Sequence, residues 1–189
     1  HYKQDQMRLK TLRRRNADTV KQSEEALADR ILCVHGTDIH TEKMDYRALA
    51  ARAKENRVTG KGKHRSKKRF GSSIAGHAPA RFLCILNRKL SYIGKELHLV
   101  DTRKYRASQF DHVTGGYTKI SLSTRWKEVG GHPVQRDLYS AFLLMNAAGD
   151  EHPDIARCND TFETFLKFHD TCICELKEAG ISRPATFGL

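Results

Sequence analysis

The sequence has no long apolar segment, no CxxC cysteine pair and too few acidic residues to balance its basic ones. The longest uninterrupted apolar run is AFLLM at 141–145, far shorter than the ~20 residues that a membrane-spanning helix needs. The five cysteines are odd in number and irregularly spaced, which argues against a disulfide framework and against a Cys-rich structural zinc site. These absences exclude a membrane-spanning protein and favour a reducing compartment.

A strong positive charge is the main feature of the composition. The chain has 189 residues and a formal net charge of +12. Its length suffices for one domain with a real core. The charge indicates a polyanionic partner, nucleic acid before an acidic membrane surface. The first residue is His rather than Met, so we expect the native N-terminus, with any targeting signal, to lie upstream.

Helical and strand-like patterns alternate along the chain. The pattern predicts strands at 38–42 and 96–100, the first of them ending at Glu42. Short strand-like pieces such as YTKISLS are expected between 102 and 133. Helices are predicted at 3–34 with Gly36 as its stop, at 44–55, from Pro79 to Gly94, after Asp137 and at 162–176. This order predicts an α/β layer fold with too few strands for a complete sheet.

A basic segment without clear periodicity occupies residues 52–71. It carries nine Lys or Arg residues against one acid between 52 and 69. We predict a mobile loop that contacts nucleic-acid phosphates; a solvated linker is the alternative. The predicted phosphate-binding residues are Lys61, Lys63, Arg65, Lys67, Lys68 and Arg69.

Two acids stand out by position, Glu42 at the end of a strand and Asp137 at the start of a helix. Asp137 permits two interpretations, a helix-start residue that accepts backbone N–H groups or a metal ligand. Metal-dependent phosphodiester cleavage needs carboxylates from different elements to hold two cations roughly 4 Å apart. The helix face expected to be buried consists of Leu138, Ala141, Phe142 and Met145. By residue type alone, Asp45, Asp101 and Asp111 are also candidate ligands.

Two sequence motifs resemble those of the TnpB-type (OrfB-family) transposases of bacterial insertion sequences. ILCVHGTDIHTEKMDYRALA is similar to the family's second nuclease motif, and VQRDLYSAFLLMN to its third. Between them, ASQ at 107–109 resembles the family's Thr-Ser-Gln triplet, and FGSSIAGHAPARFLCILNRKLSYIGKELHLVD resembles the helix and strand that lead to it. The resemblance implies a RuvC-like nuclease of the RNase H fold, with Glu42 and Asp137 as catalytic metal ligands.

The same resemblance implies the cofactor and the partners. These are two Mg²⁺ ions, a DNA target and a guide RNA, in the cytoplasm of a prokaryote and associated with its nucleoid, with neither a membrane nor a small-molecule cofactor. The domain division that it implies is a nuclease portion at 1–148 and a helical extension at 149–189. We also predict nucleic-acid contacts at Ser108, Gln109, Arg125 and Arg136. For Ser108 and Gln109, stabilisation of a turn is the alternative. His40, two residues before Glu42, is interpreted as a packing residue.

The chain departs from the family pattern at two places. No residue matches the family's first catalytic Asp, so that residue is expected either upstream of His1 or to be lost. The interval at 110–133 has no Cys where most members carry a zinc ribbon, so we expect a zinc-less hairpin there. The missing Asp leaves two alternatives to an endonuclease: a nuclease-inactive nucleic-acid-binding regulator, or a basic domain that binds only RNA.

Overall fold

The computed structural model describes residues 2–51, 56–58, 64–66, 74, 76–121, 123–149 and 152–179, with 56–58 and 64–66 described by their backbone alone. The chain forms two compact units. Unit 1 comprises 1–39 and 44–97, and unit 2 comprises 40–43 and 98–189. The short stretch 40–43 belongs to unit 2 because it pairs there with a later strand.

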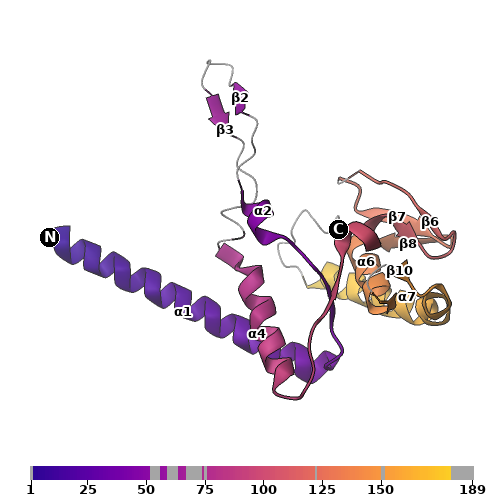
Figure 1. Ribbon diagram of the computed structural model, residues 1–189, viewed down its shortest axis with the longest axis horizontal. Helices are drawn as coiled ribbons and strands as arrows, with labels where there is room; N and C mark the ends of the chain where they lie inside the picture. The colour runs from indigo at the N-terminus through magenta and orange to yellow at the C-terminus, as the bar shows by residue number, and fades with distance from the viewer. Residues whose placement is uncertain are drawn as a thin grey trace. The chain divides into compact units, whose positions relative to one another are not determined.

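Unit 1 is built on two helices, α1 (Tyr2–His35) and α4 (Pro79–Ser91), which pack against each other (Figure 1). Their small core contains Ala28, Ile85 and Leu86. Residues 2–19 of α1 are all exposed, and they include the basic run Arg13–Arg15. The helix ends where predicted, because Gly36 follows it with a positive φ of 92° that a glycine adopts without steric cost.

Ion pairs connect the second half of α1 to α4. Glu24, only 8% exposed, accepts two hydrogen bonds from the guanidinium of Arg81, at 2.7 and 3.0 Å. Glu25 pairs with Arg88 at 2.6 Å nearer the surface. The two helices are therefore joined by charge as well as by the apolar core, since Asp29 and Lys89 form a further pair.

The rest of unit 1 differs from the sequence prediction in two respects. The helix predicted at 44–55 is α2 (Tyr46–Ala50), capped by the Asp45 carboxylate on the amide of Ala48. The segment predicted to be an unstructured loop contains two strands, β2 (Asn56–Val58) and β3 (His64–Ser66), which pair antiparallel. The loop prediction was therefore wrong for these residues. Basic residues do not prevent pairing, because the hydrogen bonds between strands are made by backbone groups.

Unit 2 begins with a parallel pair of strands, β1 (His40–Glu42) and β4 (His98–Val100). Both strands were predicted, and β1 ends at Glu42 as expected. Helix α5 (Thr102–Tyr105) and the 3₁₀ turn η1 (Ala107–Gln109) follow β4. The Asp101 carboxylate caps α5 by accepting the amide of Arg103 at 2.8 Å, and this hydrogen bond lowers the pKa of Asp101.

Two antiparallel ribbons lie in the interval where a zinc-less hairpin was expected. The first pairs β5 (Phe110–Asp111) with β6 (Gly116–Tyr117), and the second pairs β7 (Trp126–Val129) with β8 (His132–Gln135). Gly130 and Gly131 both have positive φ, as a two-residue hairpin turn requires. Among the described residues of YTKISLS, Tyr117 alone is in a strand, so that strand-like piece was misplaced.

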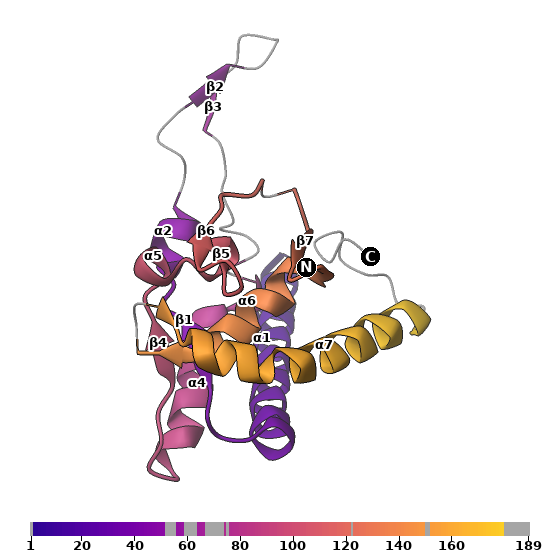
Figure 2. The same cartoon turned by 90° about the vertical axis from the view of Figure 1, so that its right-hand side faces the viewer.

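Helices α6 (Arg136–Met145) and α7 (Ile155–Glu178) complete the core of unit 2, with a small β9 (Ala147–Ala148) and β10 (His152–Pro153) ribbon between them (Figure 2). Tyr139, Phe142 and Leu143 of α6 are buried. Ala141 and Met145 are exposed and Leu138 is half-buried, so the predicted buried face was wrong at Ala141 and Met145. The reason is that nearly every side chain of 138–145 is apolar, and the sequence alone does not choose among faces.

The described elements form a mixed α/β architecture with small two-stranded sheets. Helix α7 packs on the same core as α6, through Cys158 and the rings of Phe162 and Phe165. The division predicted at residue 148 stays a prediction. Across the described residues, we find no helix with both the length and the apolar content that crossing a membrane requires.

Candidate functional site

Glu42 lies on the core-facing side of the β1–β4 pair. In the parallel register Glu42 is the partner of Val100, and partners in a sheet project to the same face. Val100 is 2% exposed and belongs to the core that contains Tyr139 and Phe142 of α6. Glu42 is half-buried as a result, and this burial raises the pKa of its carboxyl group.

Asp137 lies in the first turn of α6 but does not cap it. The cap is Gln135, whose side-chain oxygen accepts the amides of Asp137 at 2.7 Å and Leu138 at 2.8 Å. The Asp137 carboxylate remains 56% exposed and receives long contacts from Gln135 at 3.3 Å and Arg136 at 3.4 Å. The helix-start interpretation of Asp137 as the capping residue is therefore wrong.

The two predicted ligands occupy elements that pack together within unit 2. Residues of α6 contact β1, and Glu42 lies on the core-facing side of β1. Among the described residues, neither Glu42 nor Asp137 belongs to a group of three or more His, Cys, Asp or Glu side chains whose ligand atoms lie within 4.8 Å of one another. The shared cation site of Glu42 and Asp137 stays a prediction, as does the third carboxylate.

Arg136 is buried and holds a loop of unit 2. It is 9% exposed, and its guanidinium donates to the carbonyl oxygens of Ser121 at 3.3 Å and Thr124 at 3.0 Å. Its amide also donates to the carbonyl of Arg125 at 2.8 Å. These contacts give Arg136 a structural role in placing the first turn of α6. Its predicted contact with nucleic acid, like that of half-buried Arg125, stays a prediction.

The other predicted nucleic-acid contacts divide into two groups. Ser108 is exposed and Gln109 half-buried in η1, and the carbonyl of Gln109 accepts the amide of Thr118 at 2.8 Å. The basic residues of the predicted loop lie outside the described residues, except that the backbone of Arg65 is in β3. The residues outside the description are Lys61, Lys63, Lys67, Lys68 and Arg69.

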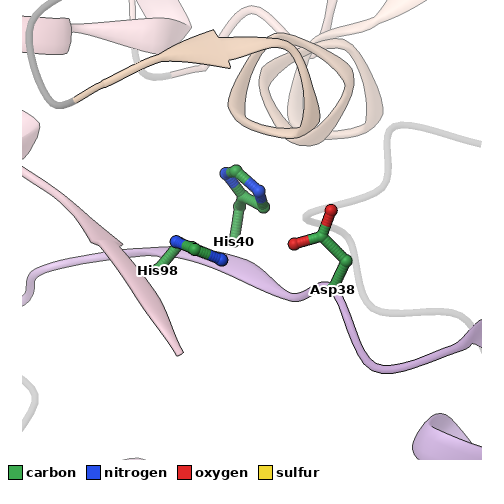
Figure 3. A group of neighbouring side chains, drawn as sticks. All are labelled: Asp38, His40 and His98. Atoms are coloured by element: carbon green, nitrogen blue, oxygen red, sulfur yellow. The ribbon is translucent and has the colours of Figure 1, made fainter. Parts of the chain in front are cut away.

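A histidine pair in unit 2 was not recognised from the sequence as a site. His40 of β1 and His98 of β4 are register partners, with ring centroids 4.6 Å apart and planes at 28°. Figure 3 shows both rings on the same side of the strands. A donor atom of one imidazole lies within 4.8 Å of a donor atom of the other. The sequence contained one signal for this pair: when the predicted strands 38–42 and 96–100 are aligned by their ends, His40 lies opposite His98.

A second polar group lies inside unit 2, around Tyr139. The Tyr139 hydroxyl accepts the amide of His112 at 3.1 Å and contacts its Nδ1 at 2.6 Å. Lys127 donates to the carbonyl of Phe110 at 2.7 Å, and its amine lies 4.0 Å from the Tyr139 ring centroid. Burial lowers the pKa of Lys127 to about 8 and lowers the pKa of His112. These contacts connect β5, β7 and α6, so the group has a structural explanation.

Comparison with known proteins adds no assignment to this geometry. No protein-family model matches the chain, and the search of curated proteins finds no match.

Proposed function

We propose that the protein is a metal-dependent DNA endonuclease with a RuvC-like site, in which Glu42 and Asp137 bind the catalytic cations. The observation that carries the proposal is the location of both acids in unit 2, one on a strand and one at the start of a helix that contacts that strand. RNA guidance and the transposable-element origin come from the resemblance of the two motifs that contain these acids.

The two side chains suit Mg²⁺ by their chemistry. Both offer carboxylate oxygens, the ligands that Mg²⁺ prefers, and Mg²⁺ keeps several waters when few protein ligands are present. Glu42 is half-buried with a raised pKa, a state that a nearby cation relieves by favouring the ionised form. When bound, the cations supply an activated water and stabilise the charge that develops on the phosphate oxygens.

The chain's own groups prepare the acids for this role. Gln135 caps α6 and contacts the Asp137 carboxylate through its amide nitrogen, so it restricts the orientation of that side chain. Arg136 fixes the preceding loop and lies against the same carboxylate. Because Gln135 accepts the first helix amides, the Asp137 carboxylate does not have to accept them and is available to an external ligand.

The positive charge supports a nucleic-acid substrate. The net charge is +12, and the exposed half of α1 carries Arg13, Arg14 and Arg15 in succession. Such clusters bind phosphates without reading sequence, and their affinity falls steeply with salt.

The test is cleavage of DNA by the full-length protein with its RNA, in Mg²⁺ and in EDTA. We expect Mg²⁺-dependent cleavage that Glu42→Gln and Asp137→Asn each reduce at least a hundredfold while DNA binding persists. Glu128→Gln, at an exposed acid of β7, is the matched control and leaves cleavage unchanged. Cleavage that persists in both site variants contradicts the proposal.

The second candidate is a nucleic-acid-binding regulator without nuclease activity. It is favoured by the observation that, among the described side chains, neither Glu42 nor Asp137 belongs to a group of three ligand-type residues. Salt-dependent binding to DNA and RNA without any Mg²⁺-dependent cleavage by the full-length protein supports this candidate over the first. Binding to RNA with none to DNA supports the domain that binds only RNA.

A further inference from the structure

We propose that His40 and His98 bind a divalent first-row transition-metal ion, of the Zn²⁺ or Co²⁺ class, across strands β1 and β4. Both residues belong to unit 2, and they are register partners in the parallel pair. Their ring centroids are 4.6 Å apart. In Figure 3 the two rings lie on the same side of the strands.

The proximity of the rings follows from the strand register. Neighbouring strands lie about 4.8 Å apart, and paired residues project to the same face, so two histidines at partner positions hold their rings side by side. The rings are stacked, with their planes at 28°. A metal ion with bonds of about 2.0–2.1 Å requires its two nitrogen ligands to lie within roughly 4.2 Å of each other. Donor atoms of the two imidazoles lie within 4.8 Å, and the proposal includes a rotation of the side chains that turns both nitrogens toward the ion.

Imidazole nitrogen is a common ligand of zinc and of iron, cobalt and nickel ions. The proposal depends on the two histidines, both of which belong to unit 2.

The donor set separates this ion from the cations of the proposed nuclease site. Imidazole nitrogen suits zinc, cobalt and nickel ions, whereas Mg²⁺ prefers the oxygen ligands of Glu42 and Asp137. A transition-metal ion at the histidines therefore neither requires nor replaces Mg²⁺. The two proposals can fail independently of each other.

The expected effect of the ion is to stabilise the strand pair. Each strand has only three residues in the ladder, so few backbone hydrogen bonds hold β1 to β4. An ion that binds only the paired form stabilises that form by mass action. Glu42 follows on the same face of β1 two residues after His40, so the ion would also restrain the strand that carries Glu42.

The first experiment titrates Co²⁺ into the intact chain and its variants at pH 7.5, with d–d absorbance as the readout. We expect one Co²⁺ per chain, with affinity reduced at least tenfold in His40→Gln and in His98→Gln. His132→Gln, at an exposed histidine of β8, is the matched control and keeps the affinity. Undiminished binding in either His40→Gln or His98→Gln overturns the proposal.

A second measurement needs no variant and covers the case in which a substitution prevents folding. Imidazole ¹⁵N spectra of the unmodified chain are recorded with increasing Zn²⁺, and we expect the signals of His40 and His98 to change together at one equivalent. Changes confined to other histidines overturn the proposal. So does a Co²⁺ spectrum dominated by thiolate charge transfer, since the chain has five cysteines.

Discussion

Gln135 caps the amide of Asp137: the side-chain oxygen of Gln135 accepts that N–H at 2.7 Å and the next one at 2.8 Å. Asp137, which the sequence suggested as a helix-start residue, therefore does not cap the helix. Its carboxylate is more than half exposed at the first turn of α6. A residue that the helix does not need for capping is available for function.

Because Gln135 is the cap, two neighbouring substitutions should change the free energy of unfolding by different amounts. Gln135→Met leaves two amides without an acceptor in a site that is 0% exposed, and we expect a loss of about 1–2 kcal/mol in the free energy of unfolding. Asp137→Asn keeps the cap and should change it by less than about 0.5 kcal/mol. Urea denaturation of both variants tests this order, and a larger loss in Asp137→Asn contradicts the assignment.

Glu42 should oppose folding stability at neutral pH. Burial raises the pKa of its carboxyl group, so the folded state disfavours the ionised form, and the stability associated with the neutral form is lost as pH rises above the ordinary glutamate value. Glu42→Gln removes that charge. We expect an unchanged or higher Tm at pH 7 in EDTA, measured by calorimetry. A Tm lowered by several degrees indicates instead that the carboxylate stabilises the fold.

The ion pairs of unit 1 should differ in importance according to burial. Glu24 is 8% exposed and doubly bonded to Arg81, whereas the Glu25 side chain is 25% exposed. Glu24→Ala leaves the guanidinium of Arg81 without its carboxylate partner at the α1–α4 contact. Glu25→Ala removes an ion pair that solvent screens. Thermal unfolding followed by helical circular dichroism should show the larger loss of Tm in Glu24→Ala. Equal losses contradict this explanation.

Lys127 should make the stability of unit 2 rise with pH. Burial lowers its pKa to about 8, with Asp111 acting in the opposite direction, while the unfolded chain keeps the ordinary value of 10.5. Between these values the unfolded state binds more protons, so the free energy of unfolding increases with pH. Lys127→Met removes this increase. Denaturation at pH 7.5, 8.5 and 9.5 gives the slope of the free energy of unfolding against pH for the unmodified chain and for Lys127→Met. Identical slopes in the two proteins rule out a titrating Lys127.

The sequence predicted those parts of the fold that depend on local signals. Gly36 and Gly94 follow helices, and Glu42 ends a strand. Each of these depends on backbone conformations that neighbouring residues specify. The position of Glu42 and Asp137 on a strand and a helix start was predicted for the same reason.

Features that depend on distant partners were not predicted. The buried face of α6 is set by α7 and the small sheets, and the apolar spacing of the mostly apolar segment 138–145 fits more than one face of a helix. Gln135 was missed because capping by Gln is less usual than by Ser, Thr, Asp or Asn. The His40–His98 pair arises from a strand register between residues far apart in the chain.

The most direct measurement of the central claim is a Mg²⁺ titration of the ¹⁵N-labelled chain followed by amide NMR. If Glu42 and Asp137 share a cation, their amide signals shift with one midpoint, and Glu42→Gln abolishes the response at Asp137. A response at Asp137 that persists undiminished in Glu42→Gln, or Mg²⁺-induced shifts at only one of the two acids, contradicts the account.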